Sequence, residues 1–231
     1  DFPTGLSQLS GDLVFDANRL VFDNLSAQTG GGQLRLAGSV SYGSGPMRFD
    51  LSLRSEQVRI RYPIGMSWLT GGTLQLTGTA QGATLSGRIT VDRLLLSDNF
   101  DFTSLLSTSN EPVSAPTTAS PFLRNLQFDV QAFSSSNARL QWSNGSSQTE
   151  ASLRIRGTWE HPILLGNIHL LGGDMQFRGS QYRLSRGDIN FVNPFRLDPV
   201  LDIEAVTKIR QYEITVNFAG PASHMTMSYR S

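Results

Sequence analysis

Apolar and polar residues alternate along most of this chain, which is the pattern of strands with one buried face. The central part of the chain shows it at Leu34–Leu36, Leu74–Leu76, Leu126–Val130, Leu140–Trp142 and Leu153–Arg156. The C-terminal part continues it at Met175–Phe177, Tyr182–Leu184, Ile189–Phe191, Leu201–Ala205, Ile214–Phe218 and Met225–Tyr229. Because every second side chain of a strand points to the same side, these segments predict sheets with one apolar and one polar face.

Glycines recur at fixed spacing between and within these segments. Two glycines, two apolar residues at alternate positions and a final glycine form a unit that occurs at Gly31–Gly38, Gly71–Gly78 and Gly172–Gly179. A second unit places two glycines nine residues apart, at Gly78 and Gly87 and again at Gly157 and Gly166. Glycine pairs favour hairpin turns, and single glycines permit kinks within strands. The spacing predicts a serial meander of hairpins.

Few segments depart from this two-residue period. Pro63–Leu69 and Phe102–Leu106 are the only stretches compatible with a helix, each of about one or two turns. Thr108–Pro121 is rich in Ser, Thr and Pro and predicts a flexible insertion loop. We therefore expect an N-terminal half (1–107), a loop (108–121) and a C-terminal half (122–231) that is continuous with the first.

Charge and composition narrow the possible functions. The 231 residues contain 19 Lys plus Arg, 19 Asp plus Glu and no Cys. A net charge of zero gives no electrostatic basis for binding nucleic acid or an anionic membrane. No stretch approaches the roughly 18 apolar residues of a membrane span, so we expect none in this piece. The chain begins at Asp1-Phe2-Pro3 without a Met, and we expect a fragment of a longer protein.

Residues with catalytic or ligating chemistry are scattered. His161, His169 and His224 have no metal-like spacing, and Gly30–Gly32 lacks the Lys and the helix of a phosphate-binding loop. Asp202 and Glu204 share one strand face, where solvated carboxylates are far more common than a glycosidase pair. We expect no metal, no cofactor and no enzymatic activity.

An apolar sheet face has to be covered, and helices are nearly absent from this sequence. A sandwich, a barrel, a β-solenoid or an open curved sheet that holds a ligand would each satisfy this need. A dozen to sixteen predicted strands favour the fourth choice, an elongated trough with an apolar concave interior whose ligand is aliphatic. The candidate lining residues are Leu34, Leu36, Leu74, Leu76, Leu126, Phe128, Leu140, Trp142, Leu153, Ile155, Met175, Phe177, Leu184, Ile189, Phe191, Ile203, Ile214, Val216, Phe218, Met225 and Met227.

An ordered series of segments in this chain is specific as a series. Its members are Leu153–Ile168 with Gly172–Phe177, then Tyr182–Phe191, Asp198–Ala205, Val216–Gly220 and Tyr229–Ser231. Phe49–Leu51, Val58–Pro63 and the Gly71-Gly72 repeat extend the series toward the N-terminus. The series resembles the C-terminal domain of the TamB family, the translocation and assembly module subunits. The first of these segments carries the family's unit G-T-x-x-x-P-x-L-x-G-x-I.

This resemblance implies a fold, a location and a function. Members of the family are AsmA-like proteins, likened to bridge-like lipid transfer proteins. They are anchored in the inner membrane and cross the periplasm of Gram-negative bacteria as an open β-sheet trough, the β-taco. They work with the outer-membrane barrel TamA, and are implicated in phospholipid transport for outer-membrane biogenesis and in the insertion of autotransporters.

We expect this chain to be a conduit segment that carries phospholipid acyl chains in its groove. The alternative is a scaffold that assembles outer-membrane β-barrel proteins with TamA by β-augmentation, in which a client strand joins a sheet edge. A carbohydrate-active β-solenoid would need carboxylates on the inner face, where the pattern places apolar residues.

Overall fold

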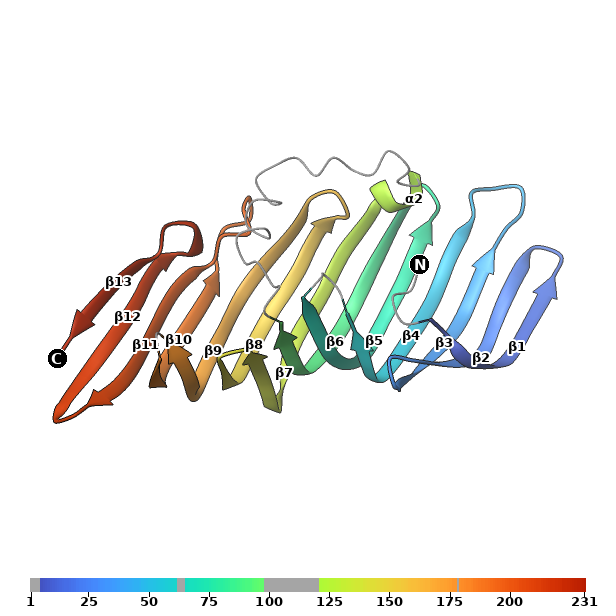
Figure 1. The fold of residues 1–231 in the computed structure, drawn as a ribbon. Helices are drawn as coiled ribbons and strands as arrows, with labels where there is room; N and C mark the ends of the chain where they lie inside the picture. Colours follow the sequence, from blue (N-terminus) through green and yellow to red (C-terminus); the bar gives the residue numbers. More distant parts are fainter. Residues whose placement is uncertain (1–4, 62–64, 98–120, 178) are drawn as a thin grey trace.

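The computed structural model describes residues 5–61, 65–97, 121–177 and 179–231, and its strands form a single curved sheet (Figure 1). Thirteen strands lie side by side in chain order, and the sheet stays open between β1 and β13. The first six are β1 (Ser7–Asp16), β2 (Arg19–Thr29), β3 (Gly32–Ser41), β4 (Arg48–Ile60), β5 (Met66–Thr79) and β6 (Gly82–Leu96). After the short helix α2 (Pro121–Arg124) come β7 (Leu126–Trp142), β8 (Gly145–Thr158), β9 (Pro162–Phe177), β10 (Ser180–Phe191), β11 (Val200–Ile209), β12 (Tyr212–Pro221), the 3-10 turn η1 (Ala222–His224) and β13 (Thr226–Arg230). The prediction of an all-β, elongated open trough is confirmed.

The sheet departs from a pure meander between β6 and β7. These two strands pair in parallel, with Ala83 opposite Leu126 and Leu94 opposite Leu140, whereas every other neighbouring pair is antiparallel. The prediction of hairpins throughout is therefore wrong at this junction, because a parallel pair needs a crossover connection. The predicted helix at 102–106 and the predicted loop lie outside the described residues, except that Pro121 opens α2.

Irregularities in strand pairing recur in the middle of neighbouring strands. The register shifts between Ser55 and Val58 on β4, between Val91 and Arg93 on β6, and between Phe133 and Arg139 on β7. A further shift lies between Gln148 and Thr149 on β8. A bulge bends its strand and increases the local twist. A row of bulges across the sheet therefore accounts for the bend that makes it a trough.

The glycine units contribute to this bend more than to turns. Gly31 and Gly32 lie at the β2–β3 turn as predicted, but Gly71-Gly72 and Gly172-Gly173 lie inside β5 and β9. The expectation of turns at these two pairs is wrong, because register shifts within strands also use glycine.

The predicted helix at 63–69 is also wrong from Met66 onward. These residues belong to β5, where Met66 lies opposite Leu96 and Trp68 opposite Leu94. Partners on the next strand thus override the local, helix-like spacing of the apolar residues.

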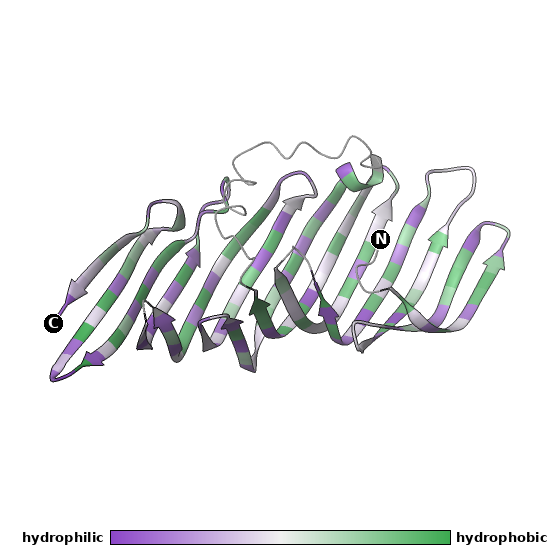
Figure 2. Ribbon diagram, in the orientation of Figure 1, coloured by the Kyte–Doolittle hydropathy of each residue, from purple (hydrophilic) through white to green (hydrophobic). Residues whose placement is uncertain are grey.

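The two faces of the sheet can be followed across strands, because residues directly opposite each other point to the same side. One such row runs Leu36, Leu53, Leu74, Gly87, Val130, Ile155 and Leu164 from β3 to β9. Figure 2 shows the alternation of apolar and polar residues along the strands. We call the side that carries this row the inner face and the opposite side the outer face.

Candidate functional site

An apolar cavity of about 340 Å³ lies on the inner face of the trough, and we call it the groove. It is bordered by strands β5 to β10 and by the connection from β10 to β11. Its lining residues are Met66, Trp68, Val91, Leu94, Leu96, Ala132, Phe133, Ser134, Ala138, Arg139, Leu140, Thr149, Ala151, Leu153, Leu164, Ile168, Ile189, Phe191, Leu197 and Pro199.

The chemistry of the groove is that of a hydrocarbon site. Among its residues Arg139 alone carries a charge, and Arg139 is exposed between the inward residues Ala138 and Leu140 of β7. Successive residues of a strand point to opposite sides, so the guanidinium belongs to the outer face. A concave surface of this composition can hold aliphatic chains by the hydrophobic effect, without hydrogen bonds or charge.

Four of the predicted lining residues border the groove: Leu140, Leu153, Ile189 and Phe191. The strand pairing places a further set on the same inner face, namely Leu34, Leu36, Leu74, Leu76, Leu126, Phe128, Trp142, Ile155, Met175, Leu184, Ile203, Ile214, Val216, Phe218 and Met227. Met225 lies between η1 and β13 and is 46% exposed. The side chain of Phe177 lies outside the described part of the chain.

Several small groove residues were not predicted. Ala132, Ala138, Thr149 and Ala151 border the cavity, and large residues that were not predicted border it as well, among them Trp68, Val91, Leu94, Leu164 and Ile168. The signal was present for two of them, since Ala132 comes two residues after Val130 and Ala151 two residues before Leu153. These small side chains leave the space that makes this part of the inner face hollow.

Farther along the sheet the inner face is packed instead of hollow. Tyr182, Leu184, Ala205 and Val216 form a buried cluster, and we call it the packed cluster. Trp142, Met175, Ile203, Ile214 and Phe218 pack against it. Ala205 is 0% exposed and Val216 1%, so the inner face is filled by its own side chains at the Tyr182–Leu184 end of β10 and beside it on β11 and β12.

Aromatic pairs join α2 and the β8–β9 turn to residues of the inner face. Phe122 of α2 packs against Phe49, with ring centroids 5.1 Å apart and a tilted geometry. Trp159, in the β8–β9 turn, lies 6.3 Å from Phe128. Tilted contacts of this kind add to the burial of both rings. They hold α2 and the β8–β9 turn at the margin of the trough.

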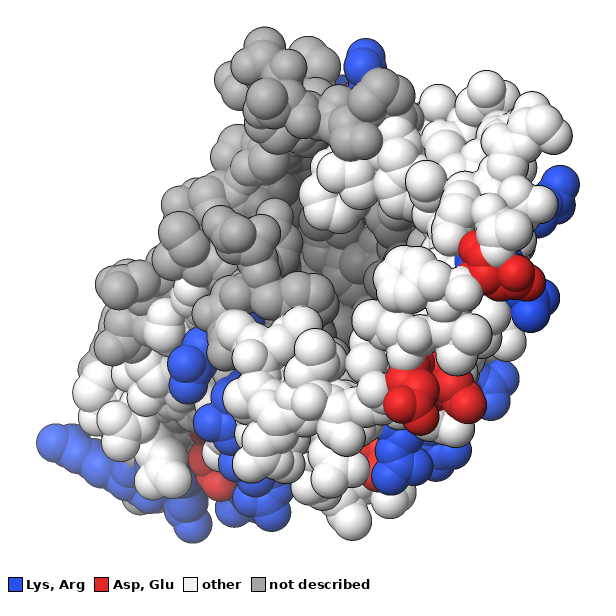
Figure 3. All heavy atoms as spheres, turned by 90° about the vertical axis from the view of Figure 1, so that its right-hand side faces the viewer, with Lys and Arg blue, Asp and Glu red and all other residues white. Residues whose placement is uncertain are grey.

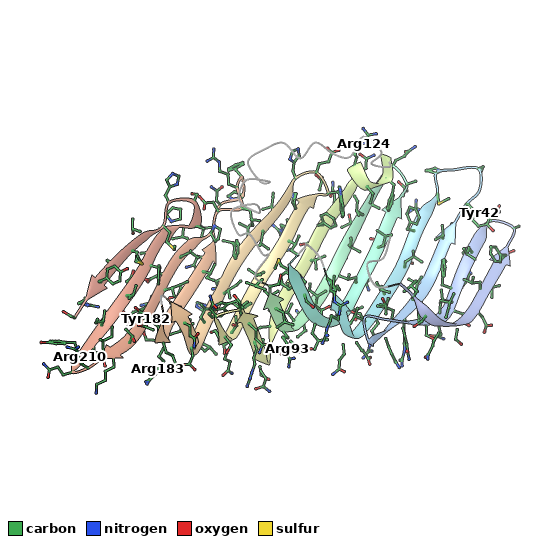
Figure 4. All side chains as sticks on the ribbon, viewed as in Figure 1. Tyr42, Arg93, Arg124, Tyr182, Arg183 and Arg210 are labelled. Carbon is green, nitrogen blue, oxygen red and sulfur yellow. The ribbon has the colours of Figure 1, made fainter. Side chains whose placement is uncertain are left out.

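Charged residues gather on the outer face. Figure 3 looks at the molecule from the β1 end and shows most of the visible Lys, Arg, Asp and Glu along the lower and right-hand margins, with other described residues in white inside these margins. Figure 4 shows the alternation at one place on β10, where Tyr182 and Arg183 are consecutive. Tyr182 is buried and Arg183 exposed, as expected for neighbours that point to opposite faces.

Arginines on the outer face pair with carboxylates across strands. Arg154 donates two hydrogen bonds to Asp129, of 2.8 and 3.0 Å, and Arg156 lies 3.6 Å from the same carboxylate. The hydrogen bond and charge of Arg154, together with Arg156, hold the pKa of the Asp129 carboxyl below its usual value. These residues form solvated ion pairs.

A second ion-pair network joins β9, β10 and β11. His169 Nδ1 lies 2.6 Å from Asp188 Oδ1, and Arg186 reaches both Asp188 (2.9 Å) and Asp202 (3.3 Å). Hydrogen bonds from His169 and then Arg186 lower the pKa of the Asp188 carboxyl. Glu204 accepts a hydrogen bond from Ser185 at 2.9 Å. Asp202 and Glu204, the carboxylates considered for catalysis, are thus engaged in strand-to-strand contacts.

We expect Asp188→Asn to destabilise the protein at neutral pH by at most about 1 kcal/mol, since its partners are largely solvated. A carboxyl with a lowered pKa in the folded state contributes stability above its unfolded pKa, and loses it as the pH falls through the folded value. The difference in unfolding free energy between wild type and Asp188→Asn should therefore be constant above a pH of about 5 and shrink below a pH of about 4. Urea unfolding between pH 7 and pH 2 measures it.

The matched control is Glu213→Gln, because the exposed Glu213 has no ion pair among the described residues. It should leave the unfolding free energy unchanged. If Asp188→Asn still has a lower unfolding free energy than wild type at the lowest pH, the ionised Asp188 carboxylate is not the cause of the destabilisation.

Other kinds of site find little support in the described residues. No group of three or more His, Asp or Glu side chains there could hold a metal ion. None of the described helices is long and apolar enough to cross a membrane.

The comparisons with known proteins agree with the geometry of the trough. A family model described as the TamB C-terminal domain matches residues 23–231, which is most of the chain. A search of curated proteins returned no match. The family is a translocation and assembly module of the Gram-negative envelope, and it takes part in outer-membrane biogenesis. By this match, together with its open apolar trough, the chain belongs to the TamB C-terminal domain family.

Proposed function

We propose that this chain is a periplasmic lipid-conduit segment, which carries phospholipid acyl chains in its groove between the inner and outer membranes. The observation that supports this best is the groove itself, about 340 Å³ of space bordered almost entirely by aliphatic and aromatic residues. A hydrophobic site of this kind fits hydrocarbon chains, and the described residues that border it direct no charged group inward that would bind a polar substrate.

The energetics fit transport as well as binding. Each methylene that leaves water for the groove gains roughly 0.8 kcal/mol, so an acyl chain is held without any directional contact. Because the hydrophobic effect is not directional, a chain can shift along the lining without breaking hydrogen bonds. Such a conduit needs no catalytic residue and no cofactor.

The direct test is to purify the chain under mild conditions and analyse it by native mass spectrometry with lipid extraction. We expect phospholipid to copurify with the wild-type chain. Protein that contains no phospholipid, and that takes none up from vesicles of phosphatidylethanolamine and phosphatidylglycerol, would contradict the proposal.

A second candidate function rests on the two open edges of the sheet. All residues of β1 and of β13 are exposed, and among the described strands each of the two has a neighbour on one side only. An unpaired strand edge can accept an extended strand from another protein. In this scaffold model a strand of a client outer-membrane barrel adds to one edge, and a TamA-like barrel is the partner of the full-length protein.

One experiment separates the two candidates. A synthetic strand peptide from an outer-membrane barrel protein is titrated against the chain, and the bound lipid is measured in parallel. Lipid copurification without peptide binding favours the conduit. Peptide binding by a lipid-free chain favours the scaffold.

A further inference from the structure

The inner face changes character along the trough. The groove extends from β5 to β10 and ends at the connection from β10 to β11. The packed cluster occupies the inner face at the Tyr182–Leu184 end of β10 and at the residues paired with it on β11 and β12. On β13 the inner-face residues Met227 and Tyr229 are exposed again. At this part of β10 to β12 the packed cluster therefore lies between the groove and β13.

The connection Val192–Pro199 has apolar side chains on both of its sides. Leu197 and Pro199 border the groove, whereas Val192 is 66% and Phe195 89% exposed. An exposure as high as that of Phe195 is unusual for a large apolar side chain, because apolar residues in the strands of this chain mostly point to the inner face. This connection is the place where the groove and an exposed apolar surface are separated by only a few residues.

Hydrogen bonds fix this connection to the rest of the rim. Asp198 accepts hydrogen bonds from the backbone N–H and the hydroxyl of Ser223, at 3.0 and 2.7 Å. The Pro199 carbonyl accepts one from the Ala222 N–H at 2.9 Å. The Leu197–Pro199 end of the connection is therefore held beside the groove.

We propose that acyl chains enter and leave the groove sideways at the Val192–Pro199 connection, and that the packed cluster closes the groove toward β13. This inference rests on the proposed lipid-conduit function. A chain that emerges past Leu197 meets the apolar surface of Phe195 and Val192, which reduces the hydrocarbon area exposed to water at that moment. A chain that continued toward β13 would have to displace close-packed side chains such as Val216, which close-packed interiors resist.

Photocrosslinking tests this route. A photoreactive phenylalanine analogue replaces one aromatic residue at a time in the full chain, so each substitution is conservative. Phe191 borders the groove, Phe195 lies on the outside of the connection, and Phe218 packs against the packed cluster. Tyr212, exposed at the β11–β12 turn, is the control. The probe lipid is phosphatidylethanolamine supplied in vesicles.

We expect lipid adducts at Phe191 and Phe195, and at least about tenfold fewer at Phe218 and Tyr212, a ratio that corresponds to about 1.4 kcal/mol. Adducts at Phe218 as frequent as at Phe191 would show that the groove continues through the C-terminal strands. Adducts at Phe191 without any at Phe195 would place the exit elsewhere. Either result overturns the inference but leaves the conduit function intact, whereas a chain without adducts or bound lipid overturns both.

Discussion

Leu153→Arg is expected to remove copurifying phospholipid from this protein. Leu153 borders the groove and lies opposite Ala132 on β7 and Gly166 on β9, two small residues that leave the space around it open. Among the described residues that border the groove there is no carboxylate to pair with a guanidinium at this place, and burying an unpaired charge costs several kcal/mol. Since 1.4 kcal/mol is a factor of ten, bound lipid per chain should fall by at least about tenfold. Native mass spectrometry with lipid extraction measures the change.

The matched control is Ser152→Arg, which introduces the same charge one residue earlier on the same strand. Ser152 is exposed on the outer face, so the variant should retain the wild-type lipid content. Circular dichroism tests whether both variants fold. If Leu153→Arg does not fold, Ala151→Phe tests the same point, because it fills the groove without adding charge. Wild-type lipid content in both groove variants would refute the conduit.

Gly166→Ala should strongly destabilise the sheet. Gly166 has a φ of +123°, and a Cβ added there would collide with the backbone carbonyl oxygen of Ser152 on β8. Both the left-handed backbone and the collision disfavour alanine, and we expect a loss of about 3 kcal/mol. For a chain of this length that lowers the melting temperature by about 6–12 °C. Differential scanning calorimetry measures it.

Gly82→Ala is the control for this substitution. Gly82 begins β6, and a Cβ added there meets no atom within 4 Å. Its melting temperature should stay within about 2 °C of wild type, as for most surface substitutions. If both variants lose the same amount in melting temperature, the close approach of the Ser152 carbonyl oxygen is not the reason why position 166 requires glycine.

The strands and their faces could be predicted from the sequence because a two-residue period has a simple physical meaning. Leu153 and Ile189 were predicted on the inner face from alternation alone, and the strand pairing places them there. Alternation says nothing about partners, however. The parallel pairing of β6 with β7 depends on contacts between residues far apart in sequence, such as Leu85 and Phe128.

The distinction between hollow and packed parts of the inner face could not be predicted. Leu153 and Val216 follow the same alternating pattern, but one borders the groove and the other is buried in the packed cluster. The difference depends on which small residues lie opposite and on how the bulges bend the strands. The position of the Val192–Pro199 connection beside the groove could not be predicted either, because apolar and polar residues do not alternate regularly in this segment.

The parallel junction between β6 and β7 also has a consequence for how this protein folds. A sheet made of hairpins grows by short loop closures, each strand adding to the one just formed, and such local contacts form quickly. At β6 and β7 this progression is interrupted, because their pairing brings together residues about forty positions apart, as with Leu85 and Phe128. Two hairpin arrays, β1 to β6 and β7 to β13, can therefore form separately, and their docking is the step with the largest loop-closure entropy.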